Sequence, residues 1–195
     1  MKSRAIFLDR DGTVSFEVGY INHLDRLRVM PRSVEAVRCI NEAGFRAVVV
    51  TNQSGVARGY FEEPLLEKAH DSLRRQLAAG GAHVDGIYYC PHHPREGEPP
   101  LRQDCTCRKP STGMLERAAK DLGIQLSGSY MVGDTMVDMR TARNAGLCGV
   151  LVLTGYGRGQ FEHHSHRWPF QPDHIAEDLR AAVSWIFSRE SIDLP

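Results

Sequence analysis

Near the start of the chain stands Ala5-Ile6-Phe7-Leu8, followed directly by Asp9-Arg10-Asp11-Gly12-Thr13. A short apolar run bounded by polar residues predicts a buried β-strand, and open α/β sheets bind ligands in a crevice at the carboxyl ends of their strands. Two carboxylates at the spacing of Asp9 and Asp11 can share a Mg²⁺ ion while one attacks phosphorus and the other handles the proton. By itself the run is also typical of a solvent-exposed turn, since Asp and Gly are common turn residues.

The rest of the chain alternates predicted strands and helices. We predict strands at residues 4–8, 45–51, 84–89, 129–133 and 149–153, and helices at 33–42, 63–79, 112–122, 137–145 and 177–187. Such alternation predicts a three-layer, Rossmann-like α/β fold, in which helices cover both faces of a mainly parallel sheet. No internal repeat or linker interrupts the pattern, so we expect a single domain over residues 1–195.

Composition narrows the class of partner. The 24 Lys and Arg residues balance the 24 Asp and Glu residues, which argues against a nucleic acid or a membrane surface as the partner. The chain has no apolar run of about 18 residues that could cross a membrane, and its start has no signal-peptide core. We therefore expect a cytoplasmic protein that acts on a small molecule. We also expect a monomer, although the sequence itself does not determine the oligomeric state.

Polar residues also follow two other predicted strands. Thr51-Asn52-Gln53-Ser54 comes after an apolar run, and a hydroxyl and amides at that place suit the oxygens of a phosphate group. Gly133-Asp134-Thr135 follows another strand, with Asp138 four residues further on. The Asp134 carboxylate can complete an oxygen-rich Mg²⁺ site beside the first two, although taken alone this residue is more typical of a cap for the next helix.

A long Pro-rich loop at residues 90–110 contains Cys90-Pro91-His92-His93 and Cys105-Thr106-Cys107. Three thiolates and one imidazole suit tetrahedral zinc, and four protein ligands leave no open position, so this zinc would be structural. A disulfide would leave one thiol unpaired and is disfavoured in a reducing compartment. Spacing alone does not decide between the two histidines. The loop ends at Arg108-Lys109, where a lysine aimed at the crevice would neutralise a nucleophile and a phosphoryl group.

Together these segments resemble the four motifs of the haloacid dehalogenase (HAD) superfamily of phosphatases. The resemblance implies that Asp9 is the nucleophile, which forms an aspartyl-phosphate, and that Asp11 is first the general acid and then the base. It implies that Thr51 and Lys109 bind the phosphoryl group. It further implies a Mg²⁺ ion held by the carboxylates of Asp9 and Asp134 and the backbone carbonyl of Asp11. No segment between the motifs is long enough for a large cap domain, so residues 16–24 and the zinc loop would form the rim of an open site.

Residues 4–153 more narrowly resemble the members of this superfamily that remove the 7-phosphate of a heptose 1,7-bisphosphate during the synthesis of nucleotide-activated heptose and the lipopolysaccharide core. That resemblance favours His92 as the fourth zinc ligand, beside Cys90, Cys105 and Cys107. It implies a substrate-binding set made of Glu17, Val18, Gly19, Tyr20, Thr51, Asn52, Gln53, Ser54, Arg108, Lys109 and Thr135. The planar fork of Arg108 suits the second phosphate.

The chain departs from the pattern of these phosphatases at two places. Many members have a lysine where this chain has Thr135, and the His-rich segment 155–172 has no counterpart. We predict that this segment is an irregular, exposed excursion, whose histidines could bind a metal only weakly.

The alternative function is that of a histidinol-phosphate phosphatase, a related enzyme that shares the motifs and the zinc loop. Its substrate carries one phosphate and a cationic amine, so a surplus of acidic residues at the rim would favour it.

Overall fold

A computed structural model describes residues 3–193 and confirms the three-layer α/β fold. Within these residues the sheet has six strands, all parallel, in the order β3-β2-β1-β4-β5-β6. The strands are β1 (Ala5–Leu8), β2 (Arg46–Asn52), β3 (Gly86–Cys90), β4 (Tyr130–Gly133), β5 (Cys148–Val152) and β6 (His174–Ala176). No inserted segment among the described residues is large enough to form a separate cap domain.

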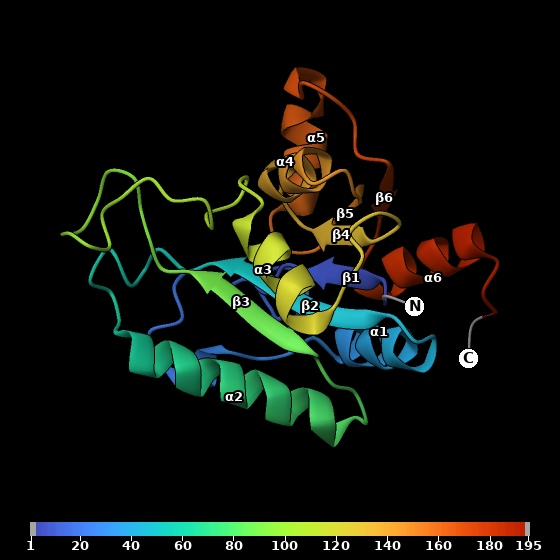
Figure 1. Cartoon of the computed structure of the whole chain (residues 1–195), viewed down its shortest axis with the longest axis horizontal. Coiled ribbons are helices and arrows are strands. Elements are labelled where there is room, and N and C mark those ends of the chain that lie inside the picture. Colours follow the sequence, from blue (N-terminus) through green and yellow to red (C-terminus); the bar gives the residue numbers. More distant parts are fainter. Residues whose placement is uncertain (1–2, 194–195) are drawn as a thin grey trace.

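Helices cover both faces of the sheet, as Figure 1 shows. On one face lie α1 (Pro31–Glu42), α2 (Glu63–Ala79) and α6 (Leu179–Glu190), and on the other lie α3 (Gly113–Leu122) and α4 (Met136–Asn144). Successive side chains of a strand point to opposite faces. Ile6 and Leu8 of β1 accordingly join the core under α1 and α6, whereas Ala5 and Phe7 join the core under α3.

The order of the strands fixes where a ligand can bind. From β1 the chain moves outward through β2 to β3, and then returns to β4 on the other side of β1. In open α/β sheets, such a reversal creates a crevice at the carboxyl ends of the strands. Asp9 is the first residue after β1, and its backbone N–H donates to the carbonyl of Val132 in β4 over 2.9 Å. The two strand ends that carry Asp9 and Asp134 therefore lie side by side.

The structure corrects the prediction for residues 155–172. Instead of an irregular excursion it contains α5 (Gly157–His164) and a short 3₁₀ helix, η2 (Ser165–Arg167), and a sixth strand follows. Gly157 and Gly159 are weak helix formers, so the helix depends on tertiary contacts. A Cβ at Gly157 would lie 1.8 Å from the carbonyl oxygen of Val152, which means that only glycine fits at this close approach.

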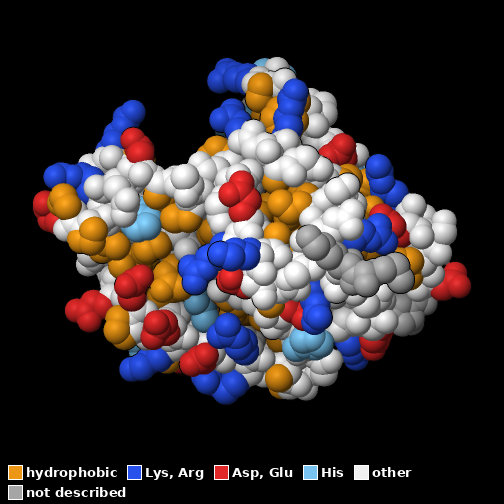
Figure 2. Space-filling view, viewed as in Figure 1, with side chains coloured by type: hydrophobic (Ala, Val, Ile, Leu, Met, Phe, Trp, Pro, Cys, Tyr) orange, Lys and Arg blue, Asp and Glu red, His pale blue; other side chains and the backbone are white. Residues whose placement is uncertain are grey.

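The surface view of Figure 2 shows acidic and basic side chains interspersed over one face of the molecule.

A further 3₁₀ helix, η1 (Leu24–Arg26), lies in the connection between β1 and α1. None of the helices in residues 3–193 combines the length and the apolar character needed to cross a lipid bilayer.

Candidate active site

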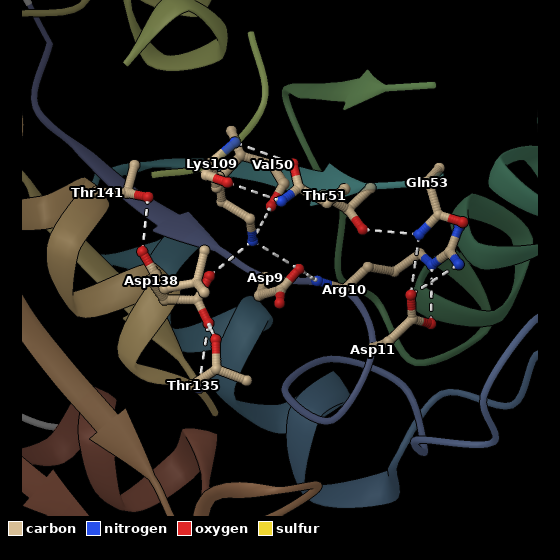
Figure 3. Close-up of polar contacts among 12 residues, drawn as sticks. Asp9, Arg10, Asp11, Val50, Thr51, Gln53, Lys109, Thr135, Asp138 and Thr141 are labelled. Atoms are coloured by element: carbon tan, nitrogen blue, oxygen red, sulfur yellow. Dashed lines mark hydrogen bonds and ion pairs between the residues drawn. The ribbon is translucent and has the colours of Figure 1, made fainter. Parts of the chain in front are cut away.

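Three carboxylates and one ammonium group meet at the carboxyl ends of β1 and β4. Oxygen atoms of Asp9, Asp134 and Asp138 all lie within 4.8 Å of one another. The Lys109 Nζ lies 2.9 Å from Oδ1 of Asp9 and 2.6 Å from Oδ1 of Asp138. Figure 3 shows these side chains pointing toward one another. When all three carboxylates are ionised, the cluster carries two more negative charges than positive ones. A divalent cation with a preference for oxygen ligands, such as Mg²⁺, fits this donor set.

Asp138 holds Lys109 in place, a role that the sequence did not indicate. Its Oδ1 accepts from Lys109, and its Oδ2 accepts from the backbone N–H of Thr135 over 3.1 Å and from the Thr135 hydroxyl over 2.6 Å. The reciprocal bonds between Thr135 and Asp138 form a capping box at the start of α4. Thr135, rather than Asp134, is thus the helix cap. Because both oxygens of Asp138 already have donors, its carboxylate is suited to orienting Lys109.

Burial changes the proton affinity of this cluster. Burial, reinforced by the neighbouring carboxylates, raises the pKa of Asp9 to about 7 and the pKa of Asp134 to about 8. Burial lowers the pKa of Lys109, but the carboxylates of Asp138 and Asp9 outweigh it and raise that pKa on balance. Lys109 therefore remains an ammonium group. A bound cation would favour the ionised carboxylates and reverse the shifts of the two aspartates.

The Asp11 side chain lies apart from this cluster. Its Oδ1 accepts from Nε of Arg10 over 3.1 Å, and its Oδ2 accepts from Nη2 of Arg10 over 2.8 Å and from Nε2 of Gln53 over 2.9 Å. The same Gln53 nitrogen donates to the Thr51 hydroxyl over 2.8 Å. The carboxylate still lines the cavity next to Asp9. It is thus placed for proton transfer rather than for binding a metal through its side chain.

A cavity of about 320 Å³ opens above the cluster. Of the predicted substrate-binding residues, eight line it: Glu17, Gly19, Tyr20, Asn52, Gln53, Ser54, Lys109 and Thr135. Three others are not among its lining residues. Val18 packs against the apolar core, Thr51 is buried at the end of β2, and Arg108 donates through Nη1 to the carbonyl of His92 over 3.1 Å.

Tyr156 also lines this cavity, and the sequence did not single it out. Its backbone N–H donates to Oδ2 of Asp134 over 2.8 Å, and the nearby Glu17 carboxylate raises the pKa of its phenol. Gly12 and Gly155 both have positive φ, and a Cβ at either would lie 2.1 Å from Oδ2 of Asp134. The loop after β5 therefore packs directly against a carboxylate of the cluster, so the segment predicted to be a surface excursion begins inside the site.

A second group of donors lies at the end of β3 and in the loop that leads to α3. The sulfur atoms of Cys90, Cys105 and Cys107 are 3.2–3.5 Å apart, and Nδ1 of His92 is 3.3 Å from the Cys107 sulfur. Disulfide sulfurs are about 2.0 Å apart, whereas ligands around tetrahedral zinc, with bonds of about 2.3 Å to sulfur, stand well beyond 3 Å. The arrangement can therefore hold a metal ion of this kind. His93 lies outside it, and its Nδ1 accepts from the backbone N–H of Glu96 over 2.9 Å.

The loop connects this group to the cavity through Lys109. The side chain of Asn52 bonds both backbone groups of Lys109: its Oδ1 accepts from the N–H over 3.0 Å, and its Nδ2 donates to the carbonyl over 3.1 Å. The Lys109 Nζ also donates to the carbonyl of Val50 over 2.9 Å. Lys109 is thus fixed by β2 and α4 as well as by the loop that precedes it.

Comparison with known proteins places the chain among phosphatases. A sequence model of the family described as HAD-hydrolase-like matches residues 106–182. The D-glycero-D-manno-heptose-1,7-bisphosphate 7-phosphatase of Thermosynechococcus vestitus is 46% identical over 195 residues, which cover 95% of this chain and 96% of that protein. The D-glycero-beta-D-manno-heptose-1,7-bisphosphate 7-phosphatase of Escherichia coli is 46% identical over 152 residues, which cover 77% of this chain and 80% of that protein.

A solved structure has the same fold. The D,D-heptose 1,7-bisphosphate phosphatase of B. bronchiseptica, crystallised with magnesium and phosphate, superposes with a TM-score of 0.83 at 35% identity. The match covers 95% of this chain and 99% of that one.

Proposed function

The chain belongs to the D-glycero-D-manno-heptose-1,7-bisphosphate 7-phosphatase family of the HAD superfamily, and on that premise we propose that it is a Mg²⁺-dependent phosphatase that hydrolyses the 7-phosphate of this sugar. One observation carries the proposal: the cluster of Asp9 and the buried Asp134 and Asp138 around the Lys109 ammonium group. It combines a nucleophile, a cation site and a fixed positive charge, the parts that phosphoryl transfer needs.

The residues of the chain divide the reaction as follows. An Asp9 oxygen attacks phosphorus, and the departing 7-hydroxyl oxygen takes a proton from Asp11. Water then attacks the aspartyl-phosphate while Asp11 accepts a proton from it, and phosphate leaves. Lys109 neutralises negative charge on the phosphoryl group as it is transferred, and Thr51 near the end of β2 helps to bind that group. Mg²⁺ would be held by the carboxylates of Asp9 and Asp134 and the backbone carbonyl of Asp11, and when bound it stabilises the negative charge on the phosphoryl oxygens.

The rim residues bear on the choice of substrate. Arg108 lies between Cys107 and Lys109 in the loop, and although its Nη1 donates to the carbonyl of His92, its planar guanidinium suits the second phosphate of a bisphosphate. Glu17 lines the cavity, and burial raises its pKa. An acidic group there also suits the cationic amine of histidinol phosphate, which makes a histidinol-phosphate phosphatase the second candidate.

The Cys90, His92, Cys105 and Cys107 group is proposed to hold a structural zinc ion. Its four protein donors fill a tetrahedral coordination shell, so the ion would fix the loop that leads to Arg108 and Lys109. In this proposal a single domain acts as a cytoplasmic monomer in the synthesis of nucleotide-activated heptose for the lipopolysaccharide core.

Steady-state kinetics test the proposal directly. With Mg²⁺ present, kcat/KM is measured for heptose 1,7-bisphosphate, histidinol phosphate and fructose 1,6-bisphosphate. We expect the heptose bisphosphate to be preferred by at least about tenfold, a difference of about 1.4 kcal/mol in transition-state binding. Preference for histidinol phosphate would establish the second candidate instead. Absence of Mg²⁺-dependent phosphate release from all three would refute both.

A further inference from the structure

Arg10 is the largest side chain that the described residues bury almost completely, with 1% of its surface exposed. The reaction described above gives it no role. Burying a guanidinium group away from water is costly unless its N–H groups find partners. Its partners therefore indicate what the residue does.

The guanidinium group joins two functional elements. Its Nε and Nη2 donate side by side to the two oxygens of Asp11, over 3.1 and 2.8 Å. The third nitrogen, Nη1, lies 3.2 Å from Nε2 of His70 in α2. A two-pronged contact of this kind fixes both the position and the plane of a carboxylate. Figure 3 shows the resulting group of Arg10, Asp11 and Gln53 beside the Asp9 and Lys109 pair.

His70 is suited to fixing the guanidinium group of Arg10 on the side away from Asp11. It is buried on α2, and burial, together with the charges of Arg10 and Arg74, lowers its pKa to about 3. The imidazole is therefore neutral near pH 7, so Nε2 can accept a hydrogen bond from Arg10 while the proton resides on Nδ1. A leucine of similar bulk would leave one guanidinium N–H of Arg10 buried without an acceptor.

We propose that Arg10, anchored by His70, is a positioning residue that sets the place and direction of the Asp11 carboxylate for proton transfer. This inference rests on the proposed role of Asp11 as general acid and base. In the first step the bond from phosphorus to the leaving oxygen breaks, and that oxygen keeps the electron pair and takes the Asp11 proton. In the second step water gives a proton to Asp11 as its oxygen bonds to phosphorus, and the bond to Asp9 breaks.

Misplacing Asp11 should therefore slow proton transfer without impairing the attack by Asp9. Within residues 3–193 the side chain of Arg10 makes no hydrogen bond or ion pair with Asp134 or Asp138, and only its backbone N–H donates to Asp9, over 2.7 Å. That backbone bond survives any substitution at position 10 except proline. A substrate whose leaving group departs without a proton should consequently be insensitive to Arg10 in the first step.

The test compares the reaction of two substrates with the Arg10→Lys variant. Lysine retains the positive charge but cannot make two parallel hydrogen bonds to the Asp11 carboxylate. Heptose 1,7-bisphosphate is mixed with excess enzyme, and its consumption in a single turnover is followed by rapid quench. p-Nitrophenyl phosphate reports the same first step as a burst of nitrophenolate. We expect consumption of the heptose bisphosphate to slow by about 10–100-fold, while the burst rate stays within about threefold of the wild type. Equal slowing with both substrates, or no slowing with either, would overturn the proposal.

Variants of His70 test the anchor independently of whether Arg10→Lys folds. His70→Leu should show the same substrate-selective loss, and His70→Gln, which supplies an amide oxygen as acceptor, should restore most of it. Arg74→Lys is the matched control, because Arg74 is exposed on the same helix and pairs with Asp71 over 3.3 Å. Equal rates in the two His70 variants would contradict the anchoring role. Inactivity of the wild type toward both substrates would refute the proposed function rather than the role of Arg10.

Discussion

Replacing Asp138 with asparagine tests whether its charge holds Lys109 in the working position. Asp138 is completely buried and lies 2.6 Å from the Lys109 Nζ. Breaking a buried ion pair costs about 3–5 kcal/mol. Asp138→Asn retains an oxygen that can accept from Lys109, and Asp9 remains as a second partner, so we expect a loss of about 2 kcal/mol. For a chain of this size that loss corresponds to a decrease in Tm of about 4–8 °C.

The loss should depend on Mg²⁺. Without a cation the cluster has three carboxylates against one ammonium group, and removing one carboxylate relieves repulsion that offsets the broken pair. With Mg²⁺ bound that repulsion is already neutralised, so the full destabilisation should be measured. Lys109 would also be less well oriented, and misplacement of a group by about 1 Å can cost about 10²-fold in rate. We therefore expect kcat to decrease by about 10–100-fold.

Thermal unfolding with and without Mg²⁺, together with kcat on the preferred sugar phosphate, checks this prediction. Asp178→Asn is the matched control, since Asp178 caps α6 by accepting from the Ala181 N–H over 2.9 Å, away from the site. Asparagine caps helices about as well as aspartate, and the pair that Asp178 also makes with Arg32, over 2.7 Å, contributes little because Arg32 is exposed. Since Asp178 does not line the cavity, the control should leave kcat unchanged. If Asp138→Asn shows an unchanged Tm in Mg²⁺ and an unchanged kcat, the carboxylate does not hold Lys109.

Three further predictions follow from the same geometry. Asp9→Asn should lower kcat by at least about 10³-fold while folding and zinc content persist, and substantial residual turnover would exclude Asp9 as the nucleophile. Cys105→Ser should reduce the zinc-to-protein ratio measured by elemental analysis and lower the Tm, because structural zinc contributes folding free energy. If the purified wild-type protein contains no zinc, the assignment of this metal is wrong. The folded-state pKa values of Asp9 and Asp134, about 7 and about 8, exceed the ordinary value of 3.8, so these groups make the metal-free protein lose stability as the pH rises from about 4 to about 8. Mg²⁺ binds the ionised form, so the increase in Tm that it causes should be larger near pH 8 than near pH 6, and the opposite order would contradict the cluster electrostatics.

The sequence predicted the parts of the site that parallel strands bring together. β1, β2 and β4 appear in it as short apolar runs, and each is followed by polar residues. Because the carboxyl ends of parallel strands share one edge of the sheet, Asp9 and Asp134 could be predicted to meet there. The grouping of Cys90, His92, Cys105 and Cys107 was predictable for a different reason, since thiolates and imidazoles so close in sequence have few uses other than metal binding in a reducing compartment.

Contacts between distant elements could not be predicted in this way. The direction of the Asp11 side chain depends on Arg10, which in turn depends on His70 from α2. Tyr156 reaches the cavity because Gly12 and Gly155 allow two loops to approach Asp134 closely. The helix α5 forms although its glycines oppose it, and β6 has only three residues, too few for a visible alternation. Each of these features is decided by packing partners far away in sequence.

The central claim is that Asp9, supported by Lys109 and a Mg²⁺ ion, removes the phosphate from carbon 7 of a heptose 1,7-bisphosphate. The most direct measurement is ³¹P nuclear magnetic resonance of the reaction of the wild-type protein with this substrate, followed with Mg²⁺ and after chelation. Our account predicts a Mg²⁺-dependent loss of the 7-phosphate resonance, equimolar growth of inorganic phosphate and a retained anomeric phosphate. Loss of the anomeric phosphate first, or no reaction with Mg²⁺ present, would contradict it.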